Sequence, residues 1–103
     1  MTVGLCRVRL RLPENHSLKD KRRVLKSLTA RIHNRFNVSV AEIDQHDRWQ
    51  MTSLGIGCVT TSEEHAHQVL SKAVAFIQRE RLDAELVDYE IEIIHAFGDP
   101  FTA

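Results

Sequence analysis

The first residues of the chain alternate between apolar and charged side chains. In "VGLCRVRLRL" (3–12) one face would hold Cys6, Val8, Leu10 and Leu12, and the other Arg7, Arg9 and Arg11. A period of two residues is typical of a β-strand with one buried and one solvated face. The pattern therefore predicts a strand that ends at Pro13.

The pattern then becomes helical. Ser17, followed by Asp20, is typical of an N-cap with an acid at the third helical position, which places a helix over about 18–35. Apolar residues recur there at the spacing of one helical face: Leu18, Leu25, Leu28, Ile32 and Phe36.

Three strands and a second helix are predicted after it. The segment 38–44 is rich in β-formers, but its apolar phase changes between Val40 and Ala41, which indicates a bulge. The later elements are expected over 49–60 (strand), 63–81 (helix) and 84–96 (strand). The last strand would hold Val87, Tyr89, Ile91 and Ile93 on one face, and Asp88, Glu90 and Glu92 on the other.

This order of elements, β-α-β-β-α-β, predicts an α+β protein with a ferredoxin-like fold. We expect a single domain over 1–103, with an antiparallel four-stranded sheet in the order 4-1-3-2 and two helices on one face. The first and last strands would then be neighbours. The three strand arginines would meet Asp88, Glu90 and Glu92 and be largely neutralised by them.

The charge is divided unevenly along the chain. The formal net charge is +0, but residues 1–35 carry ten Lys and Arg against two acids, whereas 36–103 carry four against twelve. Four cations share one face of the first predicted helix: Lys19, Arg22, Arg23 and Lys26. With one acid among their neighbours, they are suited to phosphate, although a solubilising face is the common alternative.

The composition favours a cytoplasmic protein. The hydrophobic content is 43%, and no apolar run approaches the roughly 20 residues that span a bilayer. The arginines within the N-terminal apolar stretch argue against a signal peptide. Cys6 and Cys58 lie in apolar strand patterns and are expected to be buried free thiols, with a cross-strand disulfide as the alternative.

The hairpin segment "VAEIDQHDRWQ" (40–50) is a candidate for metal chemistry. Glu42, Asp44 and His46 occupy alternate positions, so a strand would point all three to one face. Such a face beside a turn is polar in most sheets, and no second histidine or cysteine has a diagnostic spacing to it. We therefore predict no metal site and no cofactor.

The next strand carries a candidate contact with a second copy. Trp49 and Met51 share the outer phase with Gly55 and Gly57, and exposed tryptophan is common at interfaces. Paired glycines in a strand mark a place where another group lies close to the backbone. The prediction is a homodimer around these residues; the alternative is a tryptophan ring folded over the hairpin end.

Three stretches resemble the YlxP-like family of small bacterial proteins. They are "LRLPENHSLKDKRRVLKSL" (10–28), "RFNVSVAEIDQHDRWQ" (35–50) and "LGIGCV" (54–59). The resemblance implies a ferredoxin-like fold and brings no established activity or catalytic residue. Genes of this family lie near those of ribosome assembly in some bacteria, which implies an RNA or ribosomal setting by association.

The chain has no P-loop, nucleophile elbow, zinc-protease motif or dinucleotide fingerprint. We therefore predict a non-enzymatic module that binds RNA or the ribosome through its basic first helix. The alternatives are a small-molecule or metal-binding module that uses the open sheet, and a structural protein-interaction domain.

Overall fold

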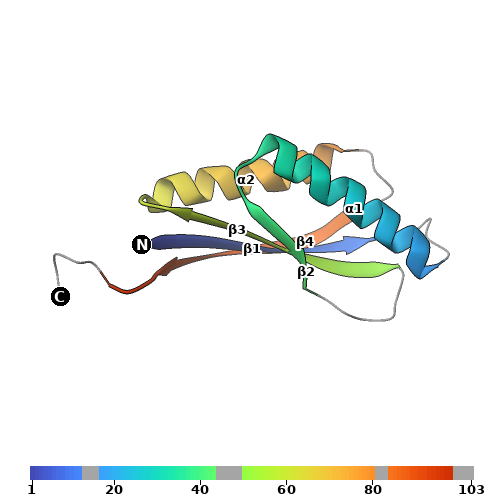
Figure 1. Ribbon diagram of the computed structural model, residues 1–103, viewed down its shortest axis with the longest axis horizontal. Coiled ribbons are helices and arrows are strands. Elements are labelled where there is room, and N and C mark those ends of the chain that lie inside the picture. Colours follow the sequence, from blue (N-terminus) through green and yellow to red (C-terminus); the bar gives the residue numbers. More distant parts are fainter. Residues whose placement is uncertain (13–16, 44–49, 81–83, 99–103) are drawn as a thin grey trace.

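The computed structural model describes residues 1–12, 17–43, 50–80 and 84–98 (Figure 1). Their elements are β1 (Thr2–Arg11), α1 (Leu18–Arg35), β2 (Ser39–Glu42), β3 (Met51–Thr60), α2 (Glu63–Arg79) and β4 (Glu85–His95). The predicted order of strands and helices is confirmed.

The four strands form one antiparallel sheet in the order β2-β3-β1-β4. Both helices cover the same side of this sheet, and the other side has no covering layer among the described residues (Figure 1). We call that uncovered side the open face. The protein therefore has the predicted α+β, ferredoxin-like fold.

The core lies between the helices and the sheet, because each element turns one apolar stripe toward that space. β1 contributes Cys6, Val8 and Leu10, which are buried, while the residues between them point to the open face. The helices contribute buried residues at helical spacing: Leu25, Leu28 and Ile32 from α1, and Ala66, Leu70, Ala73, Val74, Phe76 and Ile77 from α2.

Serine caps start both helices. The Ser17 Oγ accepts a hydrogen bond from the Asp20 N–H at 3.1 Å, as predicted, and the Ser62 Oγ accepts one from the His65 N–H at 3.2 Å. Each cap satisfies one of the N–H groups that a helix leaves unpaired at its start.

The irregularity in the sheet lies in β4. β1 and β4 pair regularly up to Arg9 opposite Asp88, and the register then shifts so that Leu10 faces Leu86. Val87 is the extra residue of this bulge and is exposed, whereas Leu86 packs against the core. The regular alternation that was predicted to run through Val87 is therefore interrupted at this residue.

The bulge predicted in the second strand is absent. β2 pairs with β3 in an unbroken register from Ser39 opposite Gly57 to Glu42 opposite Leu54. Opposed residues of an antiparallel pair share a face. Because Leu54 is buried under the helices, Glu42 lies on the helix-covered side rather than on the outward face expected for it.

Candidate interaction surfaces

The four basic residues predicted on α1 all lie exposed on that helix. We call Lys19, Arg22, Arg23 and Lys26 the basic surface of α1. Arg23 is 3.5 Å from the Asp20 carboxylate one turn away. Within the described part of the chain, Lys19, Arg22 and Lys26 have no ion-pair partner. The basic surface therefore keeps most of its positive charge.

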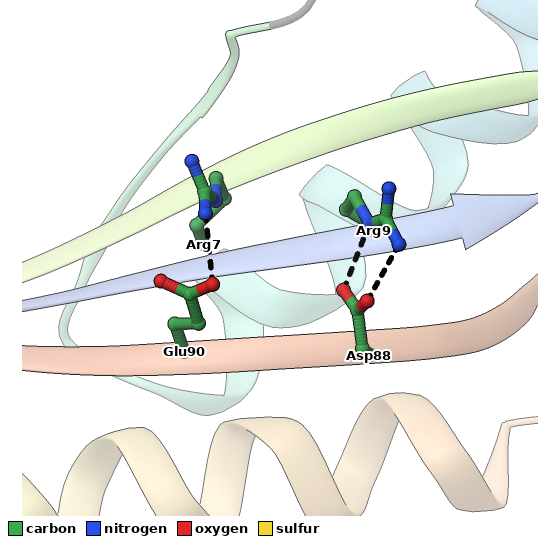
Figure 2. Close-up of polar contacts among 4 residues, drawn as sticks. All are labelled: Arg7, Arg9, Asp88 and Glu90. Carbon is green, nitrogen blue, oxygen red and sulfur yellow. Dashed lines mark hydrogen bonds and ion pairs between the residues drawn. The ribbon is translucent and has the colours of Figure 1, made fainter.

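The arginines of β1 are in the opposite situation, since each is paired with an acid of β4. The guanidinium of Arg9 donates two hydrogen bonds to Asp88, at 2.9 and 2.6 Å, and that of Arg7 donates one to Glu90 at 2.9 Å (Figure 2). The hydrogen bond from Arg9 holds the pKa of Asp88 below its usual value. The open face is consequently close to neutral.

The third pair differs from the prediction. Arg11 donates to the Glu85 carboxylate at 2.7 Å, because the bulge at Val87 moves Glu85 opposite Arg11. Glu92, the expected third partner, lies opposite Leu5 instead. Neutralisation of the strand arginines is thus confirmed, with one partner exchanged.

Lys21, which sits within the basic run of α1, does not belong to the exposed surface. It is only 4% exposed, and its ammonium lies 3.4 Å from the carboxylate of Glu42. The Thr52 hydroxyl also donates to Glu42, at 3.3 Å. This contact ties α1 to the edge of the sheet, and it explains why an acid occupies the covered face of β2.

The expected alignment of Glu42, Asp44 and His46 is only partly described. Glu42 is turned toward Lys21, and Asp44, His46 and Asp47 fall outside the described residues. Among the residues that the structure does describe, no group of three or more His, Cys, Asp or Glu side chains could hold a metal ion.

The open face has a hollow of about 500 Å³ over the two glycines of β3. We call it the glycine trough. Its floor is Gly55 and Gly57, and its walls come from β1, β2, β4 and the residue after β2: Leu5, Arg7, Ser39, Ala41, Ile43, Glu90 and Glu92. Polar and charged side chains thus stand among the walls, but most of the lining surface is apolar, which favours an apolar occupant with a few polar contacts.

The two glycines have different reasons to lack a side chain. A Cβ on Gly55 would lie 2.9 Å from the Cγ2 of Ile43, so Gly55 is needed for Ile43 to pack across the strand. A Cβ on Gly57 would lie 3.4 Å from the Cδ2 of Leu5, which is an ordinary contact. The predicted close approach is therefore explained within the chain at Gly55, and Gly57 leaves space open.

Met51, the third described residue of the predicted dimer contact, lies opposite Arg11 on the open face and is half-buried. Trp49 falls outside the described residues. Apolar side chains that sequence reasoning did not single out share this face: Leu5, Ile43, Val59 and Ile94, which are 40%, 50%, 70% and 40% exposed. The alternation of β1 and β4 marked Leu5 and Ile94 as outward-facing.

The two cysteines are free and buried, as expected. Burial raises the pKa of the Cys6 thiol to about 11, since a thiolate loses its hydration in the core. A thiol with such a pKa is a poor nucleophile near neutral pH. Cys6 is therefore a packing residue.

Comparison with known proteins places the chain in a family without an assigned function. Residues 3–91 match the family described as "Protein of unknown function (DUF503)", and the chain belongs to that family. It is also similar to the "Uncharacterized protein YlxP" of Bacillus subtilis (strain 168), with 48% identity over 61 residues. That match covers 59% of this chain and 66% of the relative.

Two solved structures show a distant likeness. A de novo designed protein, Ferredog-Diesel, aligns with a TM-score of 0.45 and 14% identity over 89% of this chain and 84% of its own. A mutant of SnoaB, described as a cofactor-independent oxygenase from Streptomyces nogalater, aligns with a TM-score of 0.46 and 10% identity over 96% of both chains. No helix in the described part of this chain is long and apolar enough to cross a membrane.

Proposed function

We propose that the protein is a non-enzymatic cytoplasmic module that binds RNA, ribosomal RNA included, through the basic surface of α1. One observation carries the proposal: the strand arginines are paired with acids, while Lys19, Arg22 and Lys26 are exposed and have no ion-pair partner among the described residues. The polyanionic backbone of a nucleic acid is the ligand that best uses several fixed cations on one helix face.

The arrangement favours contact with the sugar-phosphate backbone over reading of bases. RNA-binding sheets that read bases stack them on aromatic side chains of the open face. The strand residues on the open face here are aliphatic, polar or charged in the described part of the chain. We therefore expect modest preference for sequence and strong dependence on salt.

The test compares two double variants with the same change of net charge. Arg22→Gln with Lys26→Gln removes two cations of the basic surface, and Lys72→Gln with Arg79→Gln removes two cations of α2. Fluorescence anisotropy with a labelled single-stranded RNA of mixed sequence measures the dissociation constant at several salt concentrations. Each phosphate contact contributes about −0.7 to the log–log salt slope, so four contacts give about −3.

The α1 variant should bind more weakly and lose about half of the salt slope, because two of four phosphate contacts are gone. The α2 variant should bind as the wild type does. Equal losses in the two variants would show that only net charge matters, and no loss in either would leave α1 as a solvated face. Thermal unfolding of each variant checks that both retain the fold.

We also propose a homodimer that forms through the open face, where Met51, Gly55 and Gly57 lie. The helices cover the other side of the sheet, so a second copy at this position leaves the basic surface of α1 accessible (Figure 1). Sedimentation velocity of the full chain tests this proposal independently of RNA. A monomer at every concentration would refute it.

A further inference from the structure

The apolar surface of the open face extends beyond the glycine trough. Val3 lies opposite Val59 on one side and opposite Ile94 on the other, so these three residues form a row across three strands. Leu5, two residues further along β1, joins this row to the wall of the trough. Exposed aliphatic side chains grouped in this way on one face mark an interaction site.

A small molecule in the glycine trough would cover only part of this face. A ligand that filled the trough, with its volume of about 500 Å³, would contact Leu5 and Ile43. It would leave Val59 and Ile94 in water, because neither residue lines the trough. A protein surface, by contrast, covers the trough and the row together.

The charges of the open face favour a second copy of the same chain. Three arginines and four acids lie on it, and three of the acids already form ion pairs with the arginines. The face therefore has little net charge, and two identical faces do not repel each other. Self-complementary charge is what an isologous contact about a two-fold axis requires.

The size of the face is in the range of a small protein–protein interface. β1 has ten residues, which at the usual rise and strand spacing gives a sheet about 33 Å long and about 19 Å wide. Because β2 has only four residues, the flat area is about 540 Å², which is smaller than this rectangle, and side-chain relief adds to the surface that two faces bury. A stable complex buries about 800 Å² on each partner, with smaller values for weaker ones.

We infer that the glycine trough is the socket of a two-fold contact between two copies of this chain, with Leu5 of each copy inserted into the trough of the other. The inference rests on the proposed homodimer and names its central residues. Gly57, which has no side chain, leaves the trough open, and Leu5 of one copy fills the trough of the other copy. The row formed by Val59, Val3 and Ile94 is covered by the same contact. Two sheets that pack face to face interdigitate their side chains in this way.

The experiment is sedimentation velocity of the full chain and three variants over a wide range of concentration. Leu5→Glu places a charge on the inserted side chain, and Gly57→Arg fills the socket. Val87→Arg is the matched control, because Val87 is an exposed apolar residue of the β4 bulge and does not line the trough. We expect the first two variants to raise the dissociation constant of the dimer about 30-fold or more, as loss of a hot spot does, and the control to leave it unchanged.

A second measurement covers the case in which the charged variants fail to fold. Gly57→Cys places its Cβ 3.4 Å from the Leu5 Cδ2, an ordinary contact, and the native cysteines are buried. The new thiol should be protected from a maleimide in the dimer and labelled on dilution.

The outcomes separate the two proposals. A wild-type dimer that survives Leu5→Glu and Gly57→Arg, with Gly57→Cys labelled at every concentration, would overturn the socket and leave the homodimer standing elsewhere. A monomeric wild type would overturn both. If that monomer also bound a hydrophobic fluorescent probe that Gly57→Arg excludes, the occupant of the trough would be a small molecule.

Discussion

Lys21 and Lys19 show how two lysines of one basic run can have unrelated roles. Lys21 is buried beside Glu42, whereas Lys19 is exposed on the basic surface of α1. A buried lysine contributes through the packing of its methylene groups as well as its ion pair. The helix phase of Leu25 and Leu28, four and seven residues later, marks the inward position of Lys21.

We predict that Lys21→Ala destabilises the fold and that Lys19→Ala does not. The first change removes a buried side chain and leaves Glu42 without this cation, at a cost of about 1–3 kcal/mol in the free energy of unfolding. The second should stay within about 0.5 kcal/mol, as exposed substitutions do. Urea unfolding of both variants measures the difference. Equal free energies would show that the Lys21 contact contributes nothing.

The buried thiol of Cys6 should make the stability of the protein depend on pH. Its pKa rises from the ordinary value of 9.0 to about 11 in the folded protein, because burial disfavours the thiolate. Between these two pH values the unfolded chain releases the Cys6 proton and the folded chain keeps it. Protons bound more tightly by the folded state make stability fall as pH rises.

We therefore expect the stability advantage of the wild type over Cys6→Ala to be constant below pH 9 and to shrink between pH 9 and 11. The groups that titrate in both proteins cancel in this comparison, and the loss of packing in the variant adds only a constant offset. Chemical unfolding at several pH values measures the difference. A constant difference across the range would contradict a raised pKa for Cys6.

At the scale of elements, the two irregularities of the sheet show what sequence patterns can and cannot predict. The change of apolar phase at Val40 and Ala41 predicts a bulge, but the structure has none there: the phase changes because Glu42 faces inward to meet Lys21. The real bulge at Val87 lies in a run where apolar residues stand side by side, so either Leu86 or Val87 fits an inward position. Pairing with Leu10 of β1 places Leu86 at the inward position. The sequence of β4 alone does not show this pairing, so it cannot decide between Leu86 and Val87.

Deletion of Val87 tests the bulge. Without it, Leu86 would directly precede Asp88 in a regular strand, and the pairs Arg9–Asp88 and Arg11–Glu85 would keep their register. We expect this deletion to fold cooperatively with a small change in midpoint. Deletion of Tyr89, from the regular part of β4, is the control, because it shifts outward acids to the covered face. Thermal unfolding measures the midpoint of each deletion variant. If both midpoints fall by a similar amount, Val87 is not an extra residue that the strand can lose.

For the whole molecule, the order of elements and the strand topology followed from alternation, helical spacing and handed connections. These rules concern residues that are close in the chain or elements that follow one another, so a single sequence is enough to apply them. The glycine trough was predicted only as a close approach to Gly55 and Gly57. Its walls come from residues far apart in the chain, such as Leu5, Ile43 and Glu92, and only the folded sheet brings them together.

The two proposed surfaces lie on opposite sides of the sheet, and this has a consequence for RNA binding. In a dimer joined through the open faces, both copies of α1 lie on the outside, about 30 Å apart if each packed layer is about 10 Å thick (Figure 1). A long RNA could then engage both basic surfaces at once. The second contact would be intramolecular, and its effective concentration would raise the apparent affinity.

We therefore predict that Leu5→Glu weakens binding of a long single-stranded RNA about tenfold or more and leaves binding of a short one unchanged. Leu5 points to the open face, whereas α1 covers the other side of the sheet (Figure 1), so the intrinsic contact with phosphates should not be altered. Anisotropy with RNAs of two lengths, at concentrations where the wild type is dimeric, measures both affinities. Equal losses on both RNAs would place Leu5 in the RNA contact itself, and no loss on either would mean that each RNA uses one copy of α1.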